Sequence, residues 1–282
     1  MKKWIRYIFF GLVGLFALIG LVFTAVFVGM RFGLFNVRGS IAERNQFFAQ
    51  TSSAATSTPP CVDTAVSVCA WNATPEWTVI KGGLEKDAPV IARVSAETGV
   101  PERILAATVV PEQTRFFTSE RDIFKSYFEP LKILGSLSQF SLGVTGIKQE
   151  TANQIEMFAA STTSPFYPGA SAATLIAYPA GTVHDTELFN RLTDAKNHYY
   201  SYLYTALYIK EIESQWKAAG YDIGNKPGVI VTLFNIGFQN SKPNASPNIG
   251  GSSVESGGNT YTYGELGQDF YDSNELTDIF PK

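Results

Sequence analysis

Two hydrophobic patterns divide this chain. The sequence has 24 uncharged residues from Tyr7 to Met30, bounded by Arg6 and Arg31. About 20 apolar residues cross a bilayer as a helix, whereas a signal peptide has a shorter apolar region that ends in a cleavage site. The first pattern therefore predicts an uncleaved transmembrane anchor over 7–30. Further along the chain, apolar residues recur every three or four positions, which is typical of helices that bury one face.

The flanking charges give the anchor an orientation. Three basic residues lie within residues 1–6, whereas the three that follow the span are spread over 31–44. The positive-inside rule then places 1–6 in the cytoplasm and the rest outside. Cys61 and Cys69 are the only cysteines, and we expect them to form a disulfide in an oxidising compartment. Metal binding is the rival, but two ligands without a nearby histidine are too few.

Composition separates a linker from a folded domain. Residues 31–60 are expected to be a linker, because 45–60 are rich in Ser, Thr, Ala and Pro. We expect a disulfide-closed extension over 61–85 and a helical domain over 86–282. Residues 1–44 hold six of the 22 basic residues and one of the 25 acidic ones, which leaves the remainder with a formal net charge of −8. That charge argues against a nucleic-acid partner.

The helical pattern of the domain is interrupted by prolines and glycines. Asp87 is expected to cap a helix over 88–95 that stops at Gly99. Pro101 suits the first turn of the next helix. Pro111 should kink or end that helix at Val110, because proline cannot donate a backbone hydrogen bond. Glu112 would then project from a helix end.

The remaining periodicity predicts further helices. Residues 117–140 are interpreted as an insertion with one or two helices, and 151–158 as a short helix. Aromatic residues at helical spacing over 194–219 predict a helix whose aromatic stripe is core. Pro227 should open a helix that ends near Gly237, before a loop or small hairpin over 238–262. Two short helices are expected over 263–271 and 274–280. The fold class is mainly α.

Three short motifs carry the candidate chemistry. They are LAATVVPEQTRF with Glu112, SLGVTGIKQETA over 141–152, and TLFNIG over 232–237. Burial disfavours the ionised form of a carboxyl group, so a carboxyl beside apolar residues can act as an acid near neutral pH. The glycines of the second motif let backbone approach that carboxyl or a ligand. In order, and with helices between them, the motifs resemble the lysozyme-like fold of soluble lytic transglycosylases and goose-type lysozymes, over about residues 86–240.

The resemblance implies a peptidoglycan-cleaving enzyme without a cofactor or metal. Glu112 would protonate the bond between N-acetylmuramic acid and N-acetylglucosamine and then act as a base. The sugar's own 6-hydroxyl attacks in lytic transglycosylases, and water attacks in goose-type lysozymes. The substrate-binding residues would be Ser141, Gly143, Gly146, Gln149, Phe234 and Asn235. These assignments have simpler alternatives. Glu112 could be a surface glutamate, the glycine motif could be a tight turn before a helix, and Asn235 could cap a helix end.

The chain departs from the family at several positions. Gln113 replaces the usual serine after the glutamate, and Phe234 replaces a tyrosine, so a hydroxyl near the carboxyl is missing. Another tyrosine could supply that hydroxyl. Lys148 stands where an apolar residue is usual, and the gap from Glu112 to Ser141 is longer than in the family. These departures keep a second class open, a non-catalytic glycan-binding or scaffolding module of an envelope complex.

Other chemistry finds little support. The chain has two histidines and no zinc-peptidase, nucleophile-elbow, Walker A or dinucleotide motif. Asp122 and Glu129 are the nearest candidates for a second carboxylate in a water-using muramidase, although solvated charges are the simpler interpretation. We therefore expect a single-pass protein of a bacterial cell membrane. Its extracytoplasmic domain would act on peptidoglycan glycan strands, with envelope-complex proteins as further candidate partners.

Overall fold

The computed structural model describes residues 69–118 and 143–282, together with isolated positions between Trp4 and Thr24. This part is mainly helical, as predicted. Most of the predicted anchor, the linker over 31–60, and all but the first residues of the predicted insertion over 117–140 lie outside the described residues. No helix within the described part is both long and apolar enough to cross a membrane.

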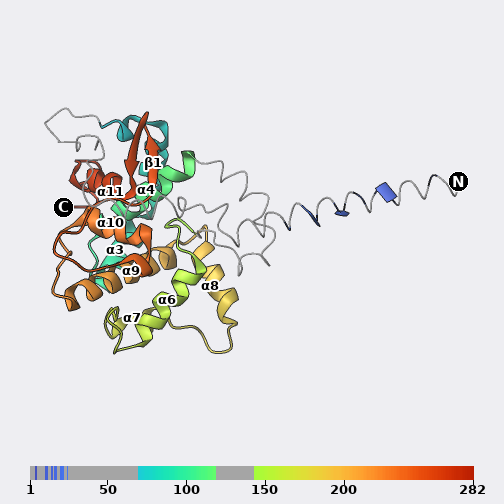
Figure 1. Cartoon of the computed structure of the whole chain (residues 1–282), viewed down its shortest axis with the longest axis horizontal. Helices are drawn as coiled ribbons and strands as arrows, with labels where there is room; N and C mark the ends of the chain where they lie inside the picture. Colours follow the sequence, from blue (N-terminus) through green and yellow to red (C-terminus); the bar gives the residue numbers. More distant parts are fainter. Residues whose placement is uncertain are drawn as a thin grey trace.

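The helix α9 lies between two groups of elements (Figure 1). On one side it contacts the helices α3, α4 and α10, and α11 packs on α4 and α10. On the other side it contacts α6 and α8, and α7 packs on α6. The bounds are η1 Trp71–Ala73, α3 Pro75–Thr98, α4 Glu102–Thr118, α6 Gln149–Ala160, α7 Ser171–Leu175, α8 His184–Thr193, α9 Tyr199–Ala218, α10 Pro227–Ile236, η3 Phe238–Asn240, β1 Ser253–Ser256, β2 Asn259–Thr262 and α11 Tyr263–Asp272.

The first long helix, α3, begins earlier than predicted. The Thr74 side chain caps it by accepting from the Trp77 backbone, and Gly99 ends it in the left-handed conformation that was expected there. The prediction that Asp87 caps a helix was wrong. Asp87 lies inside α3, where its carboxylate binds His198 and the Tyr202 hydroxyl. The boundary proposed between 85 and 86 therefore falls within a helix.

Helix α4 also corrects a prediction, because it continues through Pro111 to Thr118. Proline at 111 leaves the Ala107 carbonyl without its usual donor within the helix. Gly267 of α11 lies against that carbonyl, since a Cβ atom at 267 would be 3.0 Å from it. Packing by α11 thus occupies the position where the helix has lost a bond. Glu112 consequently lies inside α4 and not at its end.

Helices α9 and α10 form the centre of the core and confirm two predictions. The aromatic stripe on α9 is buried, including Tyr204, Tyr208 and Trp216. All ten residues of α10 are buried, from Pro227 to Ile236. The predicted hairpin also forms, with β1 and β2 paired antiparallel around Gly257 and Gly258.

The end of the chain is a turn where a helix was predicted over 274–280. The fully buried guanidinium of Arg103 on α4 explains the difference. It donates to five backbone carbonyls, those of Phe270, Tyr271, Ser273, Glu275 and Phe280. The carbonyls of Phe270 and Tyr271 lie in the last turn of α11, and the three later carbonyls turn toward the same guanidinium instead of continuing a helix. Arg103 therefore folds residues 270–280 around itself and fixes them to α4.

Candidate active site

Glu112 is a buried carboxylate held on one of its two oxygens. The residue is 3% exposed. Its Oε2 accepts from Arg115 Nη2 at 2.8 Å and from the Tyr263 hydroxyl at 3.3 Å. Arg115 lies one helical turn further along α4, the spacing at which side chains on one helix face meet.

The second oxygen, Oε1, faces backbone. Within the described residues it is buried and has no hydrogen-bond partner. Gly146 lies directly against it, because a Cβ atom on residue 146 would be only 2.1 Å from Oε1. Gly146 also has a positive φ of 68°, which disfavours any other residue. The second motif thus contacts the carboxyl through a glycine, in the way the sequence pattern suggested.

The turn that carries Gly146 is supported from behind. Gly143 packs on the Leu192 carbonyl of α8, and a Cβ atom at 143 would lie 2.1 Å from that oxygen. Gln113 donates to the Val144 carbonyl, and the Thr145 hydroxyl donates to the Ser201 carbonyl of α9. These contacts join the turn over 143–146 to both α4 and α9. Gln113 therefore has a structural role, because it holds this turn to α4.

The third motif reaches the same place through Ser252. The Asn235 Oδ1 atom accepts from Ser252 N at 2.8 Å and from Ser252 Oγ at 3.1 Å. The Ser252 hydroxyl in turn lies 3.4 Å from Arg115 Nη1. Asn235 thus fixes the backbone that enters β1, and the chain of contacts ends at Glu112. Gly146 thus contacts Glu112 directly, whereas Asn235 is linked to it through Ser252 and Arg115.

Tyr263, at the start of α11, was not identified from the sequence. Its side chain is fully buried, and its hydroxyl lies near both Glu112 Oε2 and the Thr108 carbonyl, at 3.3 and 3.2 Å. It supplies a hydroxyl beside the carboxyl, a group for which the sequence gave no candidate residue. Nothing local to Tyr263 signals this contact, because 151 residues separate it from Glu112.

The other predicted site residues have different positions. Phe234 is 2% exposed and packs on the Tyr208 ring, at 5.1 Å between centroids, so it belongs to the core. Gln149 begins α6 and is 8% exposed, and in the described part no hydrogen bond joins it to Glu112. Ser141, Asp122, Glu129 and Cys61 lie outside the described residues. Cys69 is disulfide-bonded, whereas the pairing with Cys61 stays a prediction.

A cavity of about 350 Å³ lies on the hairpin side of α4. Its walls come from Glu76 of α3, Thr114 of α4 and the hairpin residues 255–260. Thr114 is close in sequence to Glu112, but the carboxyl of Glu112 does not line this space. Across residues 69–118 and 143–282, no cluster of side chains is suited to hold a metal ion.

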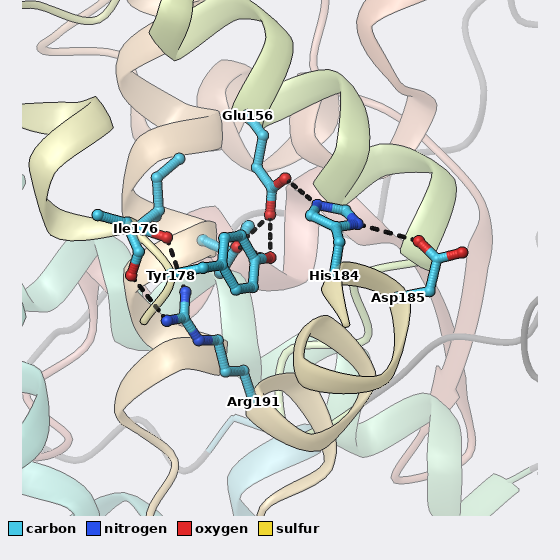
Figure 2. A network of polar contacts seen from close by, with 8 residues as sticks. Glu156, Ile176, Tyr178, His184, Asp185 and Arg191 are labelled. Atoms are coloured by element: carbon cyan, nitrogen blue, oxygen red, sulfur yellow. Dashed lines mark hydrogen bonds and ion pairs between the residues drawn. The ribbon is translucent and has the colours of Figure 1, made fainter. Parts of the chain in front are cut away.

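A second polar network joins α6, α8 and α9 (Figure 2). Glu156 of α6 accepts through Oε1 from the hydroxyls of Tyr178 and Tyr204. Its Oε2 lies 2.6 Å from Nε2 of His184, whose Nδ1 lies 3.0 Å from Asp185. Hydrogen bonds with Glu156 and then Asp185 raise the pKa of His184. Sequence analysis missed this network, because its members come from three separate segments.

Comparison with known proteins gives no functional assignment, so an assignment depends on the geometry of the site. No family model, curated protein or solved structure matches the chain. The arrangement itself offers one carboxyl group, held on one oxygen by a cation and a hydroxyl, whose other oxygen has no partner in the part of the chain that the structure describes. Such a group can donate and accept a proton in turn.

Proposed function

We propose that this protein is a membrane-anchored, extracytoplasmic lytic transglycosylase that cleaves peptidoglycan between N-acetylmuramic acid and N-acetylglucosamine. The observation that supports it is that contacts link all three motifs to one carboxyl group. Gly146 lies against Glu112, and Asn235 connects to Glu112 through Ser252 and Arg115. The residues and the order of those motifs were the basis of the family resemblance.

One carboxyl suffices for this reaction. Glu112 gives its proton to the glycosidic oxygen while the bond from that oxygen to C1 of N-acetylmuramic acid breaks. It then accepts the proton of the 6-hydroxyl, whose oxygen bonds to C1 and forms an anhydro ring. Glu112 is protonated again at the end, and no water is consumed. Oxygen Oε2 keeps its bonds to Arg115 and Tyr263 during both transfers.

One observation favours a second function. Glu112 is only 3% exposed, and its contact with Gly146 covers Oε1. A substrate can reach that oxygen only if the turn over 143–146 moves. A protein in which the turn stays closed would bind glycan without cleaving it, as a glycan-binding or scaffolding module of a cell-envelope complex.

The masses of the sugars released from purified murein distinguish these functions. Anhydro-muropeptides are the expected product of the proposed lytic transglycosylase. Products with reducing ends would replace transglycosylation by a water-using muramidase reaction. Absence of any product, together with retention of the protein on murein, would favour the scaffolding function.

The proposed location rests on the sequence of the first 60 residues. The uncharged span over 7–30 and the cysteine pair predict a single-pass protein with its domain outside the cytoplasm. We expect the full-length chain in the membrane fraction, and a chain lacking residues 1–30 in the soluble fraction. Alkylation without a reductant should modify neither cysteine, and labelling of both would contradict the disulfide.

A further inference from the structure

We propose that Arg115 is a positioning residue for the proposed cleavage, and this inference rests on the proposed function. Arg115 is 7% exposed, and it belongs to the same helix as Glu112. Its two terminal nitrogens contact different motifs: Nη2 binds Glu112 Oε2 at 2.8 Å, and Nη1 lies 3.4 Å from Ser252 Oγ. One guanidinium thus connects the first motif to the segment that Asn235 holds.

The fork of an arginine is needed for this arrangement. Its nitrogens are fixed in one plane and can bind two acceptors at once, whereas a lysine ammonium is a single point on a flexible stem. The Tyr263 ring lies 5.9 Å from the guanidinium carbon, close enough for a favourable cation–ring contact. The same tyrosine donates to Glu112. The Tyr263 ring, the Arg115 guanidinium and the Glu112 carboxylate therefore restrict one another's positions.

The consequence for Glu112 is a difference between its two oxygens. Oε2 is held by two donors, whereas Oε1 has none within the described residues. We therefore assign the proton transfer to Oε1, which a substrate reaches once the turn over 143–146 moves. The proton moves from Oε1 to the glycosidic oxygen as the C1–O bond breaks, and Oε1 later takes the proton of the attacking 6-hydroxyl. Without Arg115 the carboxyl could rotate and present either oxygen.

A purely structural role would give a different result. Arg191 provides the comparison, because it is also a buried arginine. Its side chain is 3% exposed, it donates to the Ile176 and Ala177 carbonyls, and it has a longer contact to Glu187 on its own helix. Loss of either guanidinium should lower stability. Only loss of the Arg115 guanidinium should change turnover in the folded protein.

Steady-state cleavage of purified murein by the full-length protein tests the proposal, at a temperature where circular dichroism shows each variant folded. Arg115→Lys keeps the charge but loses the fork, and we expect kcat to fall about tenfold with KM within twofold. Arg115→Ala should lower kcat about 10²-fold, which is typical of a misplaced catalytic group. Guanidinium chloride below denaturing concentrations should restore part of the Arg115→Ala rate, and equal sodium chloride should not. Arg191→Lys should leave kcat and KM unchanged.

The outcomes separate two failures. If the wild-type protein releases anhydro sugars and Arg115→Lys turns over at the wild-type rate, the positioning role is wrong and the proposed function stands. The positioning role is also wrong if Arg115→Lys raises KM and leaves kcat unchanged. Arg115→Lys keeps the test decisive if Arg115→Ala does not fold. If the wild-type protein releases nothing, the proposed function fails, and the positioning role fails with it.

Discussion

Glu112 and Glu156 are two carboxylates with similar hydrogen-bond partners, but these partners occupy both oxygens of Glu156 and only one oxygen of Glu112. Each binds one basic side chain and at least one tyrosine hydroxyl. Glu156 uses both oxygens, with Tyr178 and Tyr204 on Oε1 and His184 on Oε2. Glu112 uses only Oε2, and within the described residues Oε1 has no partner. A carboxyl with a free oxygen can exchange a proton with a substrate, whereas a saturated one supports the fold.

The two basic partners differ as well. Arg115 is buried, whereas the His184 side chain is 46% exposed and can lose its charge near neutrality. The contacts of Glu156 join three segments, as Figure 2 shows. The contacts of Glu112 instead surround one group with fixed donors. Glu112 is therefore a candidate reaction centre, whereas Glu156 holds helices together.

The largest expected effect is on cleavage. Glu112→Gln should lower turnover by about 10²–10⁴-fold or more, because an amide cannot deliver the proton. Glu156→Gln should leave turnover within twofold, since the amide still offers an oxygen to the tyrosines and an N–H to His184. Rates on purified murein check both. Equal losses in the two variants would remove the distinction between the two carboxylates.

Glu112→Gln needs a folding control that the sequence did not indicate. It leaves the buried Arg115 guanidinium without its carboxylate, and loss of one partner of a buried ion pair is destabilising. Rates should therefore be compared at a temperature where circular dichroism shows both proteins folded.

A third carboxyl extends the comparison, because Glu211 is fully buried and neither oxygen has a partner among the described residues. Burial raises its pKa to about 10 from 4.5. The unfolded chain ionises at the lower pH, so stability from this group is present below about pH 4.5 and falls as pH rises toward 10. Glu211→Gln should stabilise the protein by about 2–4 kcal/mol at pH 7. Denaturant unfolding should show no gain at pH 4, and an equal gain at both pH values would mean that ionisation of Glu211 is not the source.

A smaller effect is expected at the tyrosines. Tyr263→Phe removes the hydroxyl near Glu112 and should lower turnover about threefold to tenfold, equivalent to about 1 kcal/mol. Tyr204→Phe removes a bond to Glu156 and should lower stability by about 1 kcal/mol without a change in turnover. Measuring kcat and thermal unfolding for both variants tests whether Tyr263→Phe loses turnover and Tyr204→Phe loses stability. A turnover loss in Tyr204→Phe alone would contradict it.

The smallest expected effect depends on pH. Hydrogen bonds to Glu156 and Asp87 raise the pKa values of His184 and His198 above 6.5. A raised folded pKa contributes stability that is complete below the unfolded value and is lost as pH rises through the folded one. Melting temperature should therefore decline slightly from pH 6 to 9. The decline should be smaller in His184→Gln/His198→Gln, whereas an unchanged decline would assign it to other groups.

Periodicity was sufficient to predict the helices that carry the core. The aromatic spacing on α9, Pro227 at the start of α10 and Gly99 after α3 are local signals, and the structure agrees with them. Pro111 misled the prediction, because α4 continues past it, with α11 packed against the Ala107 carbonyl. Tertiary packing thus overrode a local rule.

Within the candidate site, the motifs identified Glu112, Gly146 and Asn235, and the structure connects them. Arg115 was within the first motif and at helical spacing from Glu112. Because the helix was predicted to end at Val110, the sequence did not indicate that Arg115 pairs with Glu112. Tyr263 and the Glu156 network depend on segments that meet only in the folded chain. Spacing along the sequence carries no information about such contacts.

Arg103 makes the last residues part of the support for α4. Its guanidinium lies on the same helix as Glu112, and it is surrounded by carbonyls from residues 270–280. Deletion of residues 273–282 would leave that buried cation short of acceptors and weaken the packing of the helix that carries the candidate acid. A purification tag should therefore be joined after a spacer. Shortened versions of the domain should keep residue 280 at the least.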